Sequence, residues 1–149
     1  MEIIGTISAI LERKGTTVWS IPPDTTVFDA IQLMAEKNVG ALLVMSGDKL
    51  VGVVSERDYT RKIALKGKSS RETAVREIIS TPVISATPTH TVEECMRLMT
   101  SNRVRHLPVL EGERLVGLVS IGDLVNWIIS AQSEAIHQLE TYIHGQYPG

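Results

Sequence analysis

The sequence predicts an α+β fold of sandwich-like α/β type. Two β-α-β-β-α motifs pack sheet to sheet with pseudo-two-fold symmetry, and an N-terminal helix and an extended C-terminal helix are added. The first observation is a repeat: shifted by 65 positions, residues 18–63 align without a gap on residues 83–128, and 18 of the 46 pairs are identical. Chance would give roughly 3. The second is that each copy holds a stretch of helical periodicity followed by two apolar runs joined by a glycine turn, the pattern of a helix and a hairpin.

The helices are predicted from their start and stop signals. A first helix is expected from Gly5 to Lys14, with Gly15 ending it. In each copy a proline-containing extended piece then leads to a threonine that starts a helix. Thr91 and Glu94 have capping-box spacing, and Thr26 with Asp29 forms a shorter version of it.

The hairpins and second helices follow in the same order in both copies. Residues 39–45 and 50–54 form the first predicted hairpin, and residues 104–110 and 115–119 the second. A helix begins near Asp58 and ends near Ala64, and its equivalent begins near Asp123 and runs to about His144. This last helix either folds back on the module or packs on a partner, through an apolar stripe of Leu124, Trp127, Ile128, Ala131, Ala135, Leu139 and Tyr142.

The domain organisation follows from the repeat. We expect one module over residues 1–149, with motifs at 16–64 and 81–135 and a connector at 65–80. Neither motif is long enough to bury its sheet alone, so the two are expected to pack together. The connector is predicted to hold a helix over residues 72–79, which Ser69 and Glu72 would cap.

The composition excludes several classes of partner. Lys plus Arg number 15 against 17 Asp plus Glu, a formal charge of −2 that gives no general attraction to nucleic acid or to an anionic membrane surface. The longest apolar run, residues 41–45, is far shorter than the ~20 residues of a membrane span. A single cysteine, Cys95, and an N-terminus without a basic leader region indicate the cytoplasm.

A Gly-x-x-Ser-x-x-Asp stretch occurs once in each copy, where a strand leads into a helix. Its serine and aspartate can both face one cleft, and a carboxylate can accept both hydroxyls of a ribose. The competing interpretation is a serine and an aspartate that only cap a helix. Repetition in register favours the binding interpretation, for Ser55 and Asp58 and for Ser120 and Asp123.

These stretches resemble a known family. Residues 52–58 and 117–123, together with His106-Leu107-Pro108-Val109, resemble the motifs of the tandem cystathionine β-synthase-type (CBS) domain pair, or Bateman module, in a stand-alone form. The resemblance covers about residues 10–135. The first copy has Ala41-Leu42-Leu43-Val44 where the second has the His106 motif, which argues against equal ligand affinity in the two halves.

The resemblance implies a ligand and its contacts. The ligand is an adenosine nucleotide such as AMP, ADP or ATP, with NAD and S-adenosylmethionine as further candidates, held in clefts between the halves. Ser55 and Asp58 are expected to serve the second half's adenine slot, and Ser120 and Asp123 the first half's. The slot residues are Thr17, Val18, Val39, Gly40 and Ala41 in the first half, and Thr81, Val83, Val104, Arg105, His106 and Pro108 in the second.

Two arginines are candidate phosphate ligands. Arg57 and Arg105 bring forked cations toward a phosphate in one cleft, whereas Gly122 and Gly40 stand at the equivalent positions of the other. The alternative is that both are solvated surface charges. His106 either contacts phosphate or bonds to backbone.

Metal binding and catalysis are not expected. His90, Cys95 and His106 lack the spacing of metal ligands. A catalytic triad is disfavoured because serine and aspartate recur in both copies whereas the histidine does not. The resemblance instead implies a regulatory sensor that forms a homodimer and signals to a separate protein. The alternatives are a ligand-free dimerising adaptor and, less favoured, a nucleotide-processing enzyme.

Overall fold

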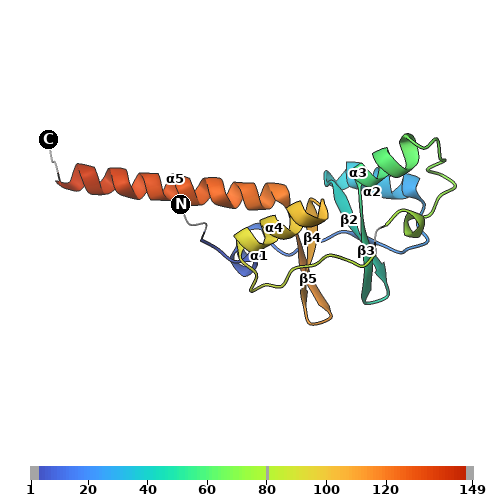
Figure 1. The fold of residues 1–149 in the computed structure, drawn as a ribbon, viewed down its shortest axis with the longest axis horizontal. Coiled ribbons are helices and arrows are strands. Elements are labelled where there is room, and N and C mark those ends of the chain that lie inside the picture. The colour runs from blue at the N-terminus through green and yellow to red at the C-terminus, as the bar shows by residue number, and fades with distance from the viewer. Residues whose placement is uncertain (1–3, 80, 147–149) are drawn as a thin grey trace.

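Two small sheets and the helices that cover them form the fold in a computed structural model, which describes residues 4–79 and 81–146 (Figure 1). The predicted α+β fold with two related halves is confirmed. The ends of the predicted module, residues 1–3 and 147–149, and Ser80 of the predicted connector lie outside the described residues.

The first repeat has a three-stranded sheet of order β1-β2-β3. β1 runs parallel to β2, and β2 pairs antiparallel with β3. The Thr26 hydroxyl accepts the backbone N–H of Asp29 at 3.1 Å and so caps α2 as predicted, but the reciprocal bond from Thr26 N–H to the Asp29 carboxylate, the other half of the predicted box, is absent. The elements are β1 (Ser20–Ile21), α2 (Val27–Lys37), β2 (Ala41–Ser46), β3 (Lys49–Ser55), α3 (Glu56–Tyr59) and the single π-helical turn η1 (Thr60–Ala64).

The second repeat reproduces this arrangement with one loss. The capping box at Thr91 forms, because Glu94 N–H donates to Thr91 Oγ1 at 3.0 Å and Thr91 N–H donates to Glu94 Oε1 at 3.2 Å. Its hairpin has the same register, pairing His106 with Ser120 where the first pairs Ala41 with Ser55. The elements are α4 (Val92–Asn102), β4 (His106–Glu111), β5 (Arg114–Ser120) and α5 (Ile121–Gln146).

The loss is the strand before α4, which is reduced to an isolated bridge between Ala86 and Val109. In the first repeat, Leu43 N–H donates to Trp19 O at 3.0 Å and extends the pairing of β1. The equivalent of Leu43 is Pro108, which has no backbone N–H. The predicted first strand of the second motif therefore does not form.

Each repeat is covered by the segment that precedes the other. α1 (Ile7–Lys14) packs on the second repeat, where Ile7 N–H donates to His90 O at 2.9 Å and Val92 N–H donates to Gly5 O at 3.1 Å. The connector repeats these bonds on the first repeat: Val75 N–H donates to Thr25 O at 2.9 Å and Val27 N–H to Thr73 O at 2.8 Å. The crossing segments tie the two halves together.

The predicted connector helix over residues 72–79 is wrong. Only one 3-10 turn forms, η2 (Val75–Glu77), and the Glu77 carboxylate accepts Ala74 N–H at 2.7 Å in place of the predicted pairing of Ser69 with Glu72. The reason is tertiary, because Val75 and Arg76 donate their backbone N–H groups to the segment before α2 and not to their own turn.

The two repeats have separate hydrophobic cores and meet through their hairpins. One core joins α1 to the second repeat around Leu107 and Leu124, and the other lies under α2 around Leu42. Side chains alternate along a strand, so the buried Ala41 and Leu43 lie on the opposite face of β2 from Leu42. Just before β2, a Cβ built on Gly40 would lie 3.7 Å from the His106 ring of the second repeat.

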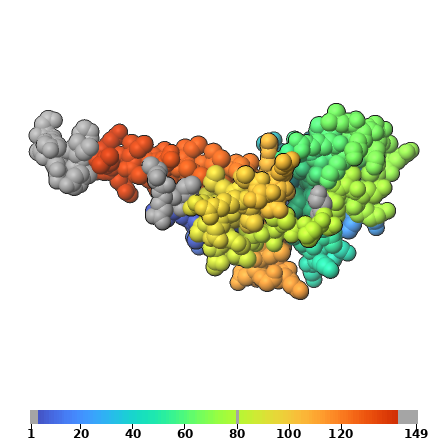
Figure 2. Space-filling view, in the orientation of Figure 1, coloured from blue at the N-terminus to red at the C-terminus, as the bar shows by residue number. Residues whose placement is uncertain are grey.

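Helix α5 packs on the body at its start and then extends away from it as a single rod (Figures 1 and 2). Leu124, Trp127 and Ile128 of the predicted stripe contact the second core, and Trp127 Nε1 donates to Ile4 O at 2.8 Å. The rest of that stripe, through Leu139, is exposed, so this part of the helix does not fold back on its own chain. The Tyr142 side chain lies outside the described residues.

Candidate functional site

A cleft of about 670 Å³ lies between the repeats. The first repeat contributes the end of β3 and the helical segment after it, and the second contributes residues around the end of α4 and the start of β4. Its lining residues are Gly40, Val53, Ser55, Glu56, Arg57, Asp58, Thr60, Arg61, Lys62, Pro82, Val83, Ile84, Asn102, Arg103, Val104, Arg105 and His106.

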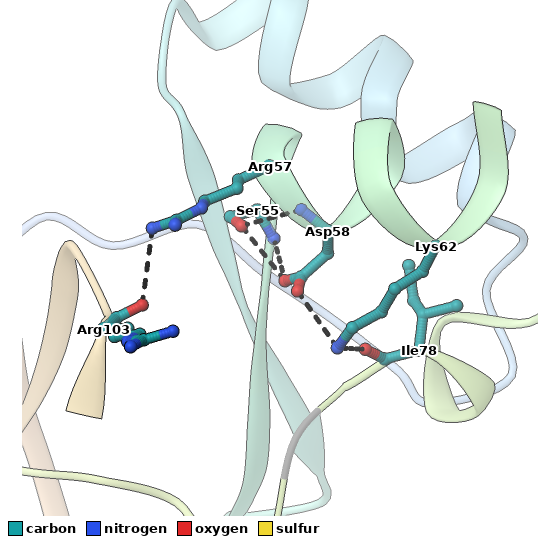
Figure 3. Close-up of polar contacts among 6 residues, drawn as sticks. All are labelled: Ser55, Arg57, Asp58, Lys62, Ile78 and Arg103. Carbon is teal, nitrogen blue, oxygen red and sulfur yellow. Dashed lines mark hydrogen bonds and ion pairs between the residues drawn. The ribbon is translucent and has the colours of Figure 1, made fainter. Parts of the chain in front are cut away.

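Asp58 stands at the wall of this cleft as the third residue of α3 (Figure 3). Its Oδ2 accepts the Ser55 backbone N–H at 2.9 Å and the Ser55 hydroxyl at 3.0 Å, and Asp58 N–H donates to Ser55 Oγ at 3.2 Å. Asp58 Oδ1 lies 3.2 Å from Lys62 Nζ, which also donates to Ile78 O at 2.6 Å. The capping role that the sequence left open is therefore present.

The arrangement limits how a diol can bind at Asp58. A carboxylate offers about four acceptor positions. The two Ser55 donors and Lys62 occupy three of them. Two ribose hydroxyls would therefore displace at least one of these donors. Since Lys62 is held at 3.2 Å and its side chain is 34% exposed, it is the donor best placed to move.

The second predicted carboxylate is engaged differently. Asp123 Oδ2 accepts Ser120 N–H at 2.8 Å, and Asp123 N–H donates to Ser120 Oγ at 3.1 Å, so the helix-capping geometry recurs. Here the cation comes from α1: Lys14 Nζ lies 2.7 Å from Asp123 Oδ2 and donates to Leu118 O at 2.9 Å. Lys14 and the Ser120 N–H thus both engage Oδ2 of Asp123.

The structure brings together most of the set predicted around Ser55 and Asp58, without Thr81 and Pro108, and adds Gly40, which was predicted in the other slot. Eight predicted site residues line the cleft: Gly40, Ser55, Arg57, Asp58, Val83, Val104, Arg105 and His106. Val18 lines a separate, shallower hollow of about 540 Å³ beside Leu11 and Gly117. The buried Pro108 donates no N–H, and its carbonyl accepts Ala86 N–H at 2.9 Å. The residues that do not line the cleft are Thr17, Val18, Val39, Ala41, Thr81, Pro108, Ser120 and Asp123.

Several cleft residues were missed by the sequence analysis. Lys62 lies four positions after Asp58, a helical ion-pair spacing that the sequence displays. Arg103 has a left-handed backbone with φ of 54° at the end of α4, and its carbonyl accepts Arg57 Nη1–H at 3.4 Å across the cleft (Figure 3). The contact of Lys14 with Asp123 joins residues 109 positions apart, and no local pattern indicates it.

His106 is partly buried and is close enough to feel the charges of both Asp58 and Asp123. Burial lowers the pKa of its imidazole, and Lys14 and Arg105 lower it further, whereas Asp123 and Asp58 act in the opposite direction. The neutral ring is therefore favoured in the folded chain. A neutral imidazole in the cleft offers one donor and one acceptor and adds no charge.

This lowered pKa predicts a pH-dependent stability. The unfolded chain protonates His106 near its ordinary pKa of 6.5, and the folded chain only at lower pH. The unfolded state thus binds more protons below about pH 6.5, and the free energy of unfolding falls as the pH drops. Urea denaturation at pH 7.5 and 5.5 should show a larger loss in the unmodified chain than in His106→Gln. Equal losses would contradict this account of His106.

The described residues were searched for metal-ligand clusters and for membrane-spanning helices. They contain no group of three or more His, Cys, Asp and Glu side chains able to hold a metal ion. Over the same residues, no helix has the length and apolarity of a membrane span. Cys95 is a buried free thiol on the core face of α4, and burial raises its pKa to about 11.

Comparisons with known proteins identify the family. The CBS domain family model matches residues 15–65 and 75–130. The chain is 40% identical over 152 residues to the mitochondrial CBS domain-containing protein CBSX3 of Arabidopsis thaliana, covering 95% of this chain and 73% of that protein. It is 32% identical over 118 residues to the CBS domain-containing protein YhcV of Bacillus subtilis, covering 79% and 84%.

A solved structure agrees with the fold. A protein with CBS domains from Burkholderia ambifaria MC40-6, whose description proposes a role in signal transduction, is 49% identical and superposes with a TM-score of 0.83, covering 86% of this chain and 96% of that one. The repeated sequence, the paired hairpins and these matches agree. The chain belongs to the CBS domain family and carries two CBS domains in tandem.

Proposed function

We propose that this protein is a regulatory module that binds an adenosine nucleotide in the cleft between its CBS domains and signals to a separate protein. The main support for this proposal is that Ser55 and Asp58 of the first domain line the same cleft as Val83 and Val104 of the second. A polar pair able to accept a ribose thus faces apolar side chains able to hold a base. A ligand in this position contacts both domains.

The regulatory step follows from that position. A ligand shifts an equilibrium only by its different affinities for the two arrangements. A nucleotide that joins Asp58 to the second domain stabilises one relative placement of the halves. Lys62 also donates to Ile78 O in the connector, so its displacement from Asp58 would change a contact between the cleft and the connector. The partner protein would respond to this change in the relative placement of the two domains.

A second, weaker site is proposed at Ser120 and Asp123, facing the first domain's slot of Thr17, Val18, Val39 and Ala41. Lys14 holds Asp123 in the described structure, and glycine replaces the cleft arginines on that side at Gly122 and Gly40. The missing guanidinium groups lower the affinity for an anionic ligand. Unequal occupancy of the two sites is the expected result.

Titration calorimetry with AMP, ADP, ATP, NAD and S-adenosylmethionine tests the proposal. Saturable binding of at least one adenosine compound supports it, and its absence for all of them leaves the ligand-free adaptor as the better account. Product analysis after long incubation with ATP or NAD tests the enzyme alternative. Turnover that Asp58→Ala abolishes would overturn the regulatory assignment.

We also propose that the protein forms a homodimer through α5 and acts in the cytoplasm. Four large apolar side chains on this helix are unusually exposed: Val125 at 41%, Ile129 at 55%, Ile136 at 59% and Leu139 at 60%. Their separations of four, seven and three residues place them along one face of a helix. A second copy of the chain that packs on this face would bury these four side chains. The lone reduced Cys95 agrees with a reducing compartment.

The dimer is tested by charging this face. Ile129→Glu with Ile136→Glu is expected to convert a dimer into a monomer in light scattering, because burying unpaired carboxylates costs several kcal/mol. A matched control is Ser133→Glu with Gln138→Glu, which adds the same charge to the helix outside the apolar set. Circular dichroism should show helix in both variants. A dimer that persists in the first variant would rule out this surface.

A further inference from the structure

The arginines of this chain divide into two groups by their contacts. The sequence has nine. Five have an acidic or aromatic side chain as partner: Arg76 pairs with Asp24, Arg97 with Glu93 and Arg114 with Glu111, while Arg13 lies over Trp127 and Arg71 over Phe28. The other four all line the cleft between the domains: Arg57, Arg61, Arg103 and Arg105.

The cleft arginines lack acidic partners. Among the described residues, no carboxylate lies within ion-pair distance of any of the four. The hydrogen bond from Arg57 to Arg103 O, at 3.4 Å, uses one of the five N–H donors of that guanidinium. The remaining donors are available to an incoming acceptor.

The charge balance of the cleft is therefore strongly positive. Five cationic side chains line it, the four arginines and Lys62, against two acidic ones, Glu56 and Asp58. Five less two leaves a net formal charge of +3, with His106 neutral. The whole chain carries −2, so the cleft is a local reversal of the overall charge. Such a cleft concentrates anions and disfavours cations.

The cleft arginines are spread over both domains, as binding of an extended anion requires. Asp58 is paired with Lys62, so the uncompensated charge belongs to the guanidinium groups. These come from both domains: Arg57 and Arg61 from the segment after β3, and Arg103 and Arg105 from the residues between α4 and β4. Guanidinium forks bind phosphate oxygens in pairs. Several phosphates in a row can engage both sets, whereas a single phosphate has fewer oxygens to share among them.

We infer that the cleft selects a nucleoside di- or triphosphate over a nucleoside monophosphate, and rejects cationic S-adenosylmethionine. The inference rests on the proposed function for the adenosine part, and the arginines supply the choice among ligands. A nucleoside monophosphate carries about two negative charges at neutral pH, and each further phosphate adds about one. A triphosphate is thus the better match to a cleft of net charge +3.

The test compares ligands and charge-matched variants. Calorimetry uses ATP, ADP, AMP, adenosine, S-adenosylmethionine and inorganic tripolyphosphate in Mg²⁺-free buffer, so that no metal neutralises the phosphates. The cleft variant is Arg61→Gln with Arg105→Gln. Its control is Arg76→Gln with Arg97→Gln, which removes the same charge from arginines that are ion-paired outside the cleft. Thermal melting verifies that both variants fold.

ATP is expected to bind about tenfold or more tightly than AMP, in line with one further charged hydrogen bond. The cleft variant should lose at least about tenfold in ATP affinity and less in AMP affinity, and its ATP affinity should depend less on salt. The control variant should resemble the unmodified chain. Equal affinity for ATP and AMP, tight binding of S-adenosylmethionine, or equal behaviour of the two variants would overturn the inference.

Failure of this inference and failure of the proposed function give different results. If AMP binding is lost in Asp58→Ala, and the affinities for AMP and ATP are equal and unchanged in the cleft arginine variant, the proposed function stands and the selectivity for polyphosphates is wrong. If tripolyphosphate binds, adenosine alone does not bind, and ATP binds no more tightly than tripolyphosphate, the anion site stands and the adenosine assignment is wrong. Binding of no ligand in the panel would remove both.

Discussion

Replacing Leu107 with alanine is expected to lower the free energy of unfolding by about 2–5 kcal/mol, the range for large-to-small changes in a core. Leu107 is 0% exposed and belongs to the core that joins α1 to the second repeat. The change leaves a cavity between elements that cannot close freely, since Ile7 N–H donates to His90 O and Gly5 O accepts Val92 N–H at the start of α4. Urea denaturation followed by circular dichroism measures the shift in midpoint.

The control for this prediction is Leu65→Ala. Leu65 has the same side chain but is 76% exposed, so its removal should change the free energy of unfolding by less than about 0.5 kcal/mol. Leu42→Ala, the equivalent change in the first core, should cost about as much as Leu107→Ala. Because the crossing segments tie the halves together, we expect one unfolding transition in each variant. Two separate transitions would show that the repeats unfold independently.

Replacing Asp58 with alanine is expected to weaken nucleotide binding at the cleft by about 1.5–3 kcal/mol, or roughly 10- to 150-fold. The proposed cause is the loss of the charged acceptor for the ribose hydroxyls. Titration calorimetry with the tightest ligand of the panel measures the change. At the proposed second site, Asp123→Ala is expected to act in the same way on a separate, weaker binding event.

The capping role of Asp58 requires a control for folding. Asp58→Ala also removes the acceptor of the Ser55 donors and the partner of Lys62, so thermal melting must show that the variant is folded at the titration temperature. Asp24→Ala removes a carboxylate that is 87% exposed and paired with Arg76, outside the cleft. Its affinity should equal that of the unmodified chain. Unchanged affinity in Asp58→Ala would remove the ribose assignment.

The fold was predictable where the signals are local. The repeat, the two hairpins and the helix starts at Thr26 and Thr91 all appear in the structure, because periodicity, glycine turns and caps act over a few neighbouring residues. Pro108 carries a further local signal, the missing N–H that removes a strand from the second repeat. The connector was mispredicted because its N–H groups bond to another part of the chain.

The candidate site divides in the same way. The two Ser-x-x-Asp turns and their equivalence follow from the sequence, since a serine and an aspartate three residues apart cap each other wherever the rest of the chain lies. Packing of the repeats is what makes Asp58 line a cleft, pairs Lys14 with Asp123, and brings together four arginines without acidic partners. The contacts of Arg57 with Arg103 and of Lys14 with Asp123 join residues 46 and 109 positions apart, and their geometry depends on how the repeats pack.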